Sequence, residues 1–214
     1  IDAYPFVPKQ MEQRMERCQD ILRIQAQGLA TRLKKIHGNS VVIGISGGLD
    51  STLALLVCHE AFKICHLDPA GIHAVTMPGF GTTDRTKNNS HTLMQLLQVS
   101  REEISIADAV YQHFKDIDHD INQHDITYEN SQARERTQIL MDLANKYNGF
   151  VVGTGDLSEL ALGWCTYNGD HMSMYAVNAS VPKTLVRYIV ESFAFKAKKE
   201  GNQALCDVLM DICD

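Results

Sequence analysis

The stretch Val41–Ser51, with the sequence VVIGISGGLDS, constrains the fold more than any other part of the chain. Val41–Ile45 is a short apolar run rich in β-branched residues, which is typical of a buried parallel strand. Gly47 and Gly48 follow it, and the apolar pattern of a helix begins after Asp50. A strand, a tight glycine turn and a helix N-terminus predict an anion site, because backbone amides and the positive end of the helix dipole face one point.

Three known motifs compete for this stretch. A Walker A loop requires a lysine where the chain has Asp50, so that interpretation fails. Gly44–Gly48 matches the G-x-S-x-G turn of serine hydrolases, with Ser46 as the nucleophile. Ser46–Ser51 resembles, at every position, the S-G-G-x-D-S loop of ATP pyrophosphatases, in which Asp50 would hold Mg²⁺ against the β- and γ-phosphates. A glycine turn that serves only the fold is a further interpretation.

Segments with strand-like and helix-like patterns alternate along the chain. Strands are predicted at residues 41–45, 71–76, 103–106 and 150–153. Helices are predicted at residues 9–37, 50–63, 129–147 and 156–162, in two stretches that end near residues 97 and 114, and from about residues 182 and 203. This alternation predicts an α/β fold with a doubly wound, mostly parallel sheet and helices on both faces. Ligands bind such a sheet at the carboxyl ends of its strands.

Polar side chains gather at a second predicted strand end. Gly153–Glu159 follows the fourth strand, so Thr154 and Glu159 are expected to face the same crevice as Asp50. The G-x-G of this segment lacks the third glycine of a dinucleotide-binding fingerprint, which excludes that interpretation. Taken alone, the segment is an ordinary turn followed by a helix cap.

The acidic run Asp116–Asp120 begins like a calcium-binding loop. Position six of such a loop requires glycine and position twelve requires glutamate, whereas the chain has Ile121 and Thr127 there. The run is therefore predicted to be a solvated loop rather than a metal site.

Composition and charge narrow the class of partner and the compartment. A net charge of −6 argues against nucleic acid or an anionic membrane surface as the partner. No apolar run approaches the roughly 18 residues of a transmembrane helix, and the first residues do not form a signal peptide. The six cysteines form no C-x-x-C pair, and Cys58 lies on an apolar helix face. Reduced thiols and a cytoplasmic location are therefore predicted.

The domain organisation follows from the ends of the chain. Residues 1–8, which include two prolines, are predicted to be an extended linker. Residues 9–214 are predicted to form one domain. The chain opens without an initiator methionine and stops within a helical pattern, so a fragment of a longer polypeptide is expected.

Four segments together resemble the NAD⁺ synthetase family: Ser46–Ser51, Tyr128–Arg134, Gly153–Trp164 and Val181–Thr184. The first marks the wider ATP pyrophosphatase (PP-loop) superfamily, and the others are specific to NAD⁺ synthetases. The run GDLSELALGW, at Gly155–Trp164, resembles the synthetase domain of the glutamine-dependent enzymes. The resemblance extends over most of the chain and implies the adenine nucleotide alpha-hydrolase-like fold.

The resemblance implies a ligase that forms a C–N bond by ATP-dependent amidation of deamido-NAD⁺ (nicotinic acid adenine dinucleotide). The carboxylate of deamido-NAD⁺ would attack the α-phosphorus of ATP to give an acyl-adenylate and pyrophosphate. Ammonia would then displace AMP and form NAD⁺. Mg²⁺ is the implied cofactor and ATP the cosubstrate. An N-terminal glutamine amidase domain would supply ammonia in the longer polypeptide. Nothing in this sequence resembles that domain, so the chain is expected to use free ammonia. The resemblance also implies a homo-oligomer, at least a dimer.

The resemblance also implies which residues carry this chemistry. The catalytic residues would be Ser46, Asp50, Ser51 and Lys183, and the Mg²⁺ ligands would be Asp50 and Glu159. The ATP-binding residues would be Gly44, Ile45, Ser46, Gly47, Gly48, Leu49, Asp50, Ser51, Met77, Thr154 and Lys183. The deamido-NAD⁺-binding residues would be Asn130, Arg134, Glu159, Trp164, Cys165, Thr166 and Tyr167. A packed core indole is the alternative for Trp164, and a surface residue is the alternative for Arg134.

Other functions remain open at this point. A serine hydrolase would need an aspartate and then a histidine after Ser46, and Asp156 and His171 have that order. Another amidating or sulfur-transferring PP-loop enzyme would use a different acceptor. A nucleotide-binding module without catalysis would bind ATP and release no pyrophosphate.

Overall fold

The computed structural model describes residues 4–80 and 84–214. The helices are α1 (Met11–Ile36), α2 (Leu49–Cys65), η1 (Pro69–Gly71), α3 (Asp84–Leu96), α4 (Ala107–Asp116), α5 (Ile126–Lys146), α6 (Leu157–Leu162), α7 (Lys183–Lys199) and α8 (Gln203–Cys213). The strands are β1 (Val41–Gly44), β2 (Ile72–Thr76), β3 (Ser100–Glu103), β4 (Phe150–Gly153) and β5 (Tyr175–Ala176).

The strands form one parallel sheet in the order β3-β2-β1-β4-β5. Val41 of β1 is in register with Ile72 on one side and Phe150 on the other. The chain therefore builds the sheet outward from β1 in one direction and then returns to its other side with β4. The carboxyl ends of β1 and β4 flank the point where the strand order reverses, which is where open α/β sheets bind ligands.

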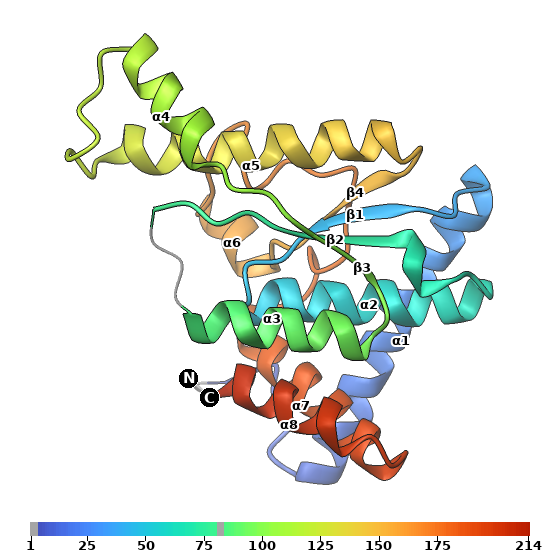
Figure 1. Cartoon of the computed structure of the whole chain (residues 1–214). Helices are drawn as coiled ribbons and strands as arrows, with labels where there is room; N and C mark the ends of the chain where they lie inside the picture. The colour runs from blue at the N-terminus through green and yellow to red at the C-terminus, as the bar shows by residue number, and fades with distance from the viewer. Residues whose placement is uncertain (1–3, 81–83) are drawn as a thin grey trace.

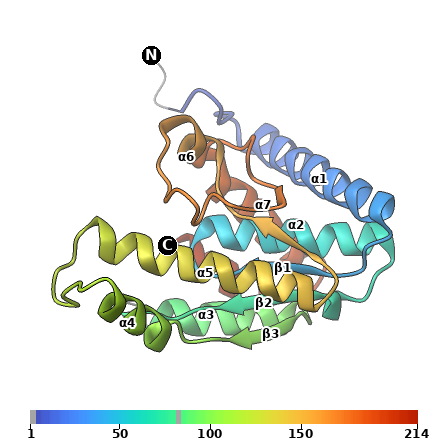
Figure 2. The ribbon, with the colours of Figure 1, turned by 90° about the horizontal axis from the view of Figure 1, so that it is seen from above.

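Helices cover both faces of the sheet (Figures 1 and 2). On one face, α2 lies between the sheet and a layer that includes α1 and α7, and α8 packs against α7 and α3. On the other face, α5 runs across β1 and β4 and contacts α4. The predicted doubly wound α/β fold is confirmed.

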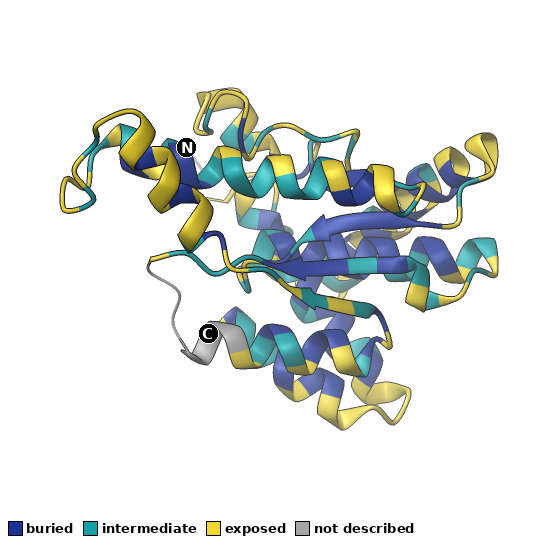
Figure 3. Ribbon diagram, turned by 45° about the horizontal axis from the view of Figure 1, so that its top comes forward, coloured by how far each residue is buried: buried dark blue, intermediate teal, exposed yellow. Residues whose placement is uncertain are grey.

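The central strand is buried on both faces (Figure 3). Val41 and Ile43 belong to the large core beneath α2, whereas Val42 packs with Val75 and Leu143 beneath α5. Because side chains of a strand alternate between faces, a strand covered on both sides reads as a continuous apolar run. This is why the first strand was visible in the sequence.

Two parts of the sheet differ from the sequence prediction. The third strand is Ser100–Glu103 rather than 103–106, because β3 is an edge strand whose half-buried positions tolerate polar residues. Ile104 N still donates to Thr76 O (2.9 Å), so the predicted segment contains only the end of the pairing. The short strand β5 was not predicted, since two residues in an irregular segment carry no period.

Helix ends also shifted slightly. The left-handed residue that ends α1 is His37 (φ 52°) rather than Gly38. Pro182 is the N-cap of α7 rather than its first helical residue. Asp84 and its neighbouring threonines are residue types that often cap helices, but their side chains lie outside those that the structure describes. Within residues 4–80 and 84–214, no helix is long and apolar enough to cross a membrane.

Candidate active site

The glycine turn after β1 has the geometry expected of an anion-binding loop. Gly47 adopts a left-handed conformation (φ 85°), which favours glycine, and Gly48 is the N-cap of α2. Ser46 Oγ accepts a hydrogen bond from Gly48 N (3.3 Å) and lies 3.1 Å from Ser51 Oγ. No side-chain group caps α2, so the amides of its first turn can bind a ligand.

Three carboxylates and one ammonium meet beside this turn. Carboxylate oxygens of Asp50, Asp156 and Glu159 lie within 4.8 Å of one another. Lys183 Nζ donates to Asp50 Oδ2, lies 3.3 Å from Asp156 Oδ2 and donates to Glu159 Oε1 at 3.4 Å. The structure thus brings together the predicted residues from the ends of β1 and β4 and the start of α7, and it adds Asp156.

The short helix α6 orients two of these carboxylates through a capping box. Asp156 Oδ1 accepts hydrogen bonds from Ser158 N (2.7 Å) and Glu159 N (3.0 Å), and Glu159 Oε2 accepts from Asp156 N (3.2 Å). The second oxygen of each carboxylate remains directed at Lys183. Sequence reasoning identified Asp156 as a helix start and missed its place in the cluster, although the capping pattern D-x-x-E was visible.

A buried asparagine joins the two loops. Asn178 is fully buried, and its Nδ2 donates to Asp50 O and Thr154 O, both at 3.0 Å. Gln25 Nε2 of α1 donates to Asn178 Oδ1 (3.1 Å), which holds the amide in this orientation. Asn178 lies in the irregular segment that precedes α7, so no pattern in the sequence marked it.

The charges favour a bound cation at this cluster. Burial opposes the charged form of Lys183, but the hydrogen bond and charge of Asp50, together with Asp156 and Glu159, raise its pKa. Asp50 Oδ1 is buried and makes no hydrogen bond, and buried Asp156 Oδ2 has only the 3.3 Å ion-pair contact with Lys183. Hard carboxylate oxygens left in this state fit a divalent cation such as Mg²⁺. Among the described residues, no other group of three or more acidic, histidine or cysteine side chains lies close enough together to hold a metal ion. The acidic run at 116–120 forms no such group.

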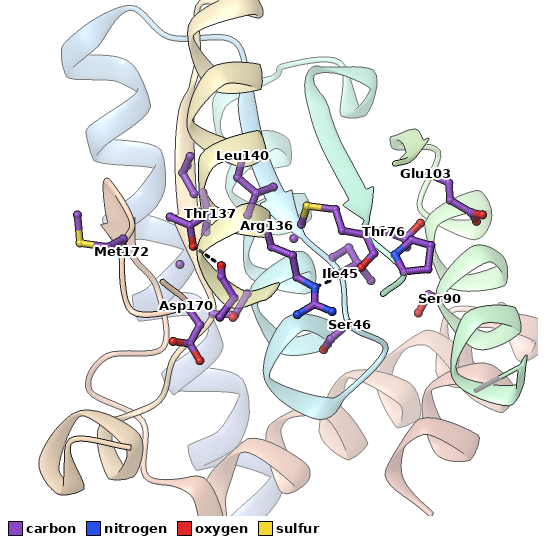
Figure 4. A pocket seen from close by; sticks show the side chains of 18 residues that line it. Ile45, Ser46, Thr76, Ser90, Glu103, Arg136, Thr137, Leu140, Asp170 and Met172 are labelled. Atoms are coloured by element: carbon purple, nitrogen blue, oxygen red, sulfur yellow. Dashed lines mark hydrogen bonds between the residues drawn. The ribbon is translucent and has the colours of Figure 1, made fainter. Parts of the chain in front are cut away.

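A pocket of about 400 Å³ opens at the carboxyl ends of β1, β2 and β4, beneath α5 (Figure 4). Met77, Thr154 and Gly44–Ser46, which the resemblance implies as ATP-binding residues, are among the residues that line it. Its walls are mainly apolar, with Leu140 of α5 above. Arg136, also on α5, points into the pocket, and sequence reasoning missed it because its helix face carried no distinguishing pattern.

The residues expected to bind deamido-NAD⁺ lie on α5 and on the segment after α6. Asn130 Oδ1 accepts from Thr166 Oγ1 (2.8 Å), and Arg134 Nε donates to Tyr167 O (3.1 Å). Cys165 and Tyr167 are exposed. Trp164 is 80% exposed, so the interpretation as a packed core indole is wrong for this chain. Asn130 and Thr166 are half-buried and Arg134 is exposed, whereas Glu159, on α6, belongs to the carboxylate cluster.

The serine-hydrolase alternative lacks its triad. Ser46 Oγ has Ser51 Oγ and Gly48 N as partners, with no histidine among them. His171 Nδ1 lies 2.7 Å from Thr166 O, and Asp156 is engaged by the α6 cap and Lys183. The G-x-S-x-G match therefore does not correspond to a nucleophile and its base.

Comparison with known proteins agrees with this geometry. The family model described as NAD synthase matches residues 21–198. The chain belongs to the NAD synthase family. The residues that the family model matches include the glycine turn, the three clustered carboxylates and Lys183 at the start of α7.

The curated relatives that the chain matches below are longer than the chain itself. It is 45% identical over 195 residues to the glutamine-dependent NAD⁺ synthetase of Mycobacterium leprae, covering 89% of this chain and 29% of that protein. It is 44% identical over 219 residues to the Mycobacterium bovis enzyme of the same name, covering 100% and 32%. The chain thus spans about a third of the length of these relatives.

Solved structures show the same fold. The glutamine-dependent NAD⁺ synthetase of Acinetobacter baumannii, in complex with ADP, superposes with a TM-score of 0.78 and 26% identity over 88% of this chain and 35% of that one. The NH₃-dependent NAD synthetase of Campylobacter jejuni gives 0.73 and 22% over 92% and 93%. The second likeness, at its lower identity, shows the fold alone.

Proposed function

We propose that this chain catalyses ATP-dependent amidation of deamido-NAD⁺ to NAD⁺, with ammonia as the nitrogen donor and AMP and pyrophosphate as the other products. The observation that carries the proposal is the cluster of Asp50, Asp156, Glu159 and Lys183 beside the glycine turn. This cluster supports the proposal because its carboxylates would suit a divalent cation and its ammonium would suit phosphate groups bound at the glycine turn. Membership of the NAD synthase family is the reason for proposing deamido-NAD⁺ as the acceptor of the adenylyl group.

The first step is adenylation of the substrate carboxylate. One carboxylate oxygen of deamido-NAD⁺ forms a bond to the α-phosphorus, and the bond from that phosphorus to the bridging oxygen breaks, so its electron pair leaves with pyrophosphate. The negative charge that develops on pyrophosphate would be stabilised by hydrogen bonds from the amides of Gly47 and Gly48 and from the hydroxyls of Ser46 and Ser51. Leu49, as the first residue of α2, adds an amide to the same loop. The ammonium of Lys183 would stay in contact with the phosphate groups as pyrophosphate leaves.

Magnesium fits the carboxylate cluster by its donor set. Asp50 and Glu159 would hold the ion, and Asp156 lies within reach of the same position. When bound, the ion would supply positive charge to the phosphate oxygens during bond cleavage. The residues of this chain orient that charge through the α6 capping box and the Asn178 amide.

The pocket beneath α5 suits the adenosine part of ATP. Its apolar lining, which includes Ile45 and Met77, can cover a purine, and Thr154 lies at its β4 end. A Cβ added at Gly44 would lie 3.1 Å from Leu140 Cδ1 and 3.4 Å from Met77 Cε, so glycine at this strand end leaves room for the two side chains that line the pocket. The A. baumannii relative is described as bound to ADP.

The second step takes place on the exposed side of the cluster. Asn130, Arg134 and Trp164–Tyr167 would bind deamido-NAD⁺, with Glu159 at the reacting end. Ammonia attacks the activated carbonyl carbon, a C–N bond forms, and the carbonyl–phosphate oxygen bond breaks to release AMP. Loss of a proton from nitrogen completes the amide.

The partners follow from the relatives. We infer that a glutaminase domain in the longer polypeptide delivers the ammonia, since the matched relatives are named glutamine-dependent. The large exposed side chains Leu162, Trp164 and Tyr167 support association of at least two copies near the substrate surface. Six free cysteines support a reducing, cytoplasmic location.

Pyrophosphate release from Mg·ATP, measured with and without deamido-NAD⁺ in ammonium buffer, tests the proposal. We expect release that depends on deamido-NAD⁺ and is matched by NAD⁺. Release without NAD⁺ would show adenylation without amide transfer. No release, followed by release with another carboxylate acceptor, would replace the substrate in the proposal.

The variant Asp50→Asn provides the matched test of the metal assignment. It keeps the size of the side chain and removes the charge, so turnover should fall roughly 100-fold or more while the melting temperature is retained. Asp142→Asn, an exposed residue of α5, is the control and should turn over normally. Normal turnover by Asp50→Asn would remove Asp50 from the cation site.

A further inference from the structure

Arg136 is a cation directed into the pocket beneath α5. Its half-buried guanidinium points toward Ser46, the first residue of the glycine turn (Figure 4). The other charged side chains that line the pocket are those of Glu103 and Asp170, so among the described lining residues Arg136 is the one cation. The mechanism above gives it no role.

The charge of Arg136 lacks a close counter-ion. Among the side chains that the structure describes, those of residues 4–80 and 88–214, no carboxylate oxygen forms an ion pair with its guanidinium within 4.0 Å, and Glu129 and Asp170 act on it only from farther away. Burial accordingly lowers its pKa, with those two carboxylates opposing the effect. A half-buried cation without an ion-pair partner is complementary to an anion that enters the pocket.

The loop after β2 fixes the position of this guanidinium. Arg136 Nε donates to Met77 O (3.2 Å), and one helical turn away Gln132 Oε1 accepts from Phe80 N (3.4 Å). A Cβ at Gly79 would lie 3.0 Å from an Arg136 Nη atom and 2.5 Å from Gln132 Oε1, so both side chains pack closely against the backbone of this loop. With Nε occupied by the loop, the terminal N–H groups are those directed into the pocket.

We propose that Arg136 binds the α-phosphate of ATP and holds it through adenylyl transfer. The inference rests on the proposed function. If the base lies against Met77 and Leu140 and the β- and γ-phosphates lie in the glycine turn, the α-phosphate lies between them, where Arg136 points. Its N–H groups donate to the non-bridging oxygens of that phosphate, whose charge is redistributed as the bond to pyrophosphate breaks. No proton is transferred.

Equilibrium binding of adenosine and AMP separates this role from catalysis. The two ligands differ only by the phosphate that corresponds to the α-phosphate, and titration calorimetry in EDTA removes any metal contribution. For Arg136→Gln we expect AMP to bind roughly ten- to hundredfold more weakly, while adenosine affinity stays within about twofold. Far-UV circular dichroism and thermal melts establish that the variant folds.

Gln132→Met is the matched control, because it weakens the same loop contact without removing the cation. It should change the affinities for adenosine and AMP by equal factors. Arg136→Lys retains the charge and should recover part of the preference for AMP. Equal losses for both ligands in Arg136→Gln would make Arg136 a loop-shaping residue and overturn the proposal, as would unchanged AMP binding.

The outcomes also distinguish this proposal from the proposed function. A phosphate-specific loss in Arg136→Gln supports the α-phosphate contact even if no NAD⁺ is formed by the unmodified chain. Failure of the unmodified chain to bind either ligand would overturn the nucleotide pocket, and with it the assignment of Arg136. If the unmodified chain forms NAD⁺ but Arg136→Gln binds AMP with unchanged affinity, the proposed function is supported and only the α-phosphate contact of Arg136 is overturned.

Discussion

At the scale of single residues, Lys183 contacts more of the site than any other predicted side chain. Its ammonium touches carboxylates from two loops, and its own backbone N donates to Ser158 Oγ (3.1 Å), which ties the start of α7 to α6. The raised pKa of Lys183 keeps the ammonium charged across the physiological range. A permanent charge on a flexible stem can move from carboxylates to phosphates without changing its protonation state.

Lys183→Met is expected to lower kcat more than it raises KM for ATP. The ammonium is needed most when charge develops on the departing pyrophosphate, so roughly a 100-fold loss in kcat is expected. Steady-state pyrophosphate release checks this. Lys196→Met, on the same helix and half-exposed, is the control and should behave as the unmodified chain. An effect confined to KM would assign Lys183 to ground-state binding alone.

At the scale of elements, the site depends on how loops after β1 and β4 are tied to each other. Asn178 bridges their carbonyl groups, and α1 reaches in through Gln25 to hold the amide. The first helix of the chain therefore contributes to the geometry of a site located on the sheet. α2 links the same region to the core, since its apolar face is buried along most of its length.

Replacement of this bridge should destabilise the fold and loosen the cation site together. Asn178→Ala leaves Asp50 O and Thr154 O without their donor in a buried position, at a cost of about 2–4 kcal/mol in the free energy of unfolding. Urea denaturation gives the value. Asn145→Ala, at an exposed position of α5, should change it by less than about 0.5 kcal/mol. A neutral Asn178→Ala would mean that ordered water replaces the amide.

His59 on α2 makes the stability of the chain depend on pH. Burial, assisted by the charges of Lys63 and Lys196, lowers the pKa of His59 to about 4, whereas Glu60 opposes the shift. The unfolded chain, with an ordinary histidine pKa near 6.5, binds the proton more readily. The contribution of His59 to stability is therefore complete above pH 6.5 and is lost as the pH falls toward 4.

Urea unfolding at pH 8 and pH 5 measures this contribution. From the two pKa values, His59 should account for about 2 kcal/mol of the stability lost between those conditions. His59→Gln cannot titrate, so its loss should be smaller by that amount. Equal losses in the variant and the unmodified chain would show that His59 is accessible to protons in the folded state.

At the scale of the whole molecule, burial divides the cysteines into reactive and protected groups. Cys165 is exposed, whereas Cys18, Cys58, Cys206 and Cys213 are buried. Burial raises the pKa of Cys18 to about 11 and that of Cys213 to about 12, so their thiolates are scarce near neutral pH. The exposed thiol lies on the segment after α6, and the protected thiols of α1, α2 and α8 lie in the large core.

Alkylation at pH 8 should therefore modify Cys165 first. Intact-mass analysis after brief iodoacetamide treatment is expected to show one adduct, and peptide mapping should place it at Cys165. Cys165→Ser should show no rapid adduct until the chain is unfolded in urea. Rapid labelling of Cys18 or Cys213 in buffer would indicate that the α1–α7 layer opens in the native protein.

The sequence predicted the parts of this molecule whose signal is local. Strand β4 was predicted with its observed bounds, since a run of three buried apolar residues that ends in glycine has few alternatives. The predicted meeting of Asp50 and Glu159 is confirmed, because the ends of β1 and β4 lie at one edge of a parallel sheet. Lys183 joins them from the start of α7. Binding by these residues stays a prediction.

Residues that act through long-range contacts could not be predicted. Asn178 bonds to chain segments 128 and 24 positions away, and no local pattern encodes such a pair. Arg136 occupies a helix position that looks solvent-facing until the loop after β2 packs against it. The two-residue strand β5 depends entirely on its neighbour β4. The roles of Asn178 and Arg136 and the existence of β5 therefore depend on tertiary contacts rather than on the local secondary-structure propensity of the sequence.

The contact between Lys183 and the three carboxylates implies an exchange of cations. Before any substrate arrives, the tethered ammonium acts as an internal counter-ion that keeps mutually repelling carboxylates in place. A metal ion alone would have to compete with it, whereas a metal–nucleotide complex brings its own acceptor for the displaced ammonium. The chain should therefore select its metal already bound to nucleotide, and the acidic cluster should remain ordered throughout the exchange.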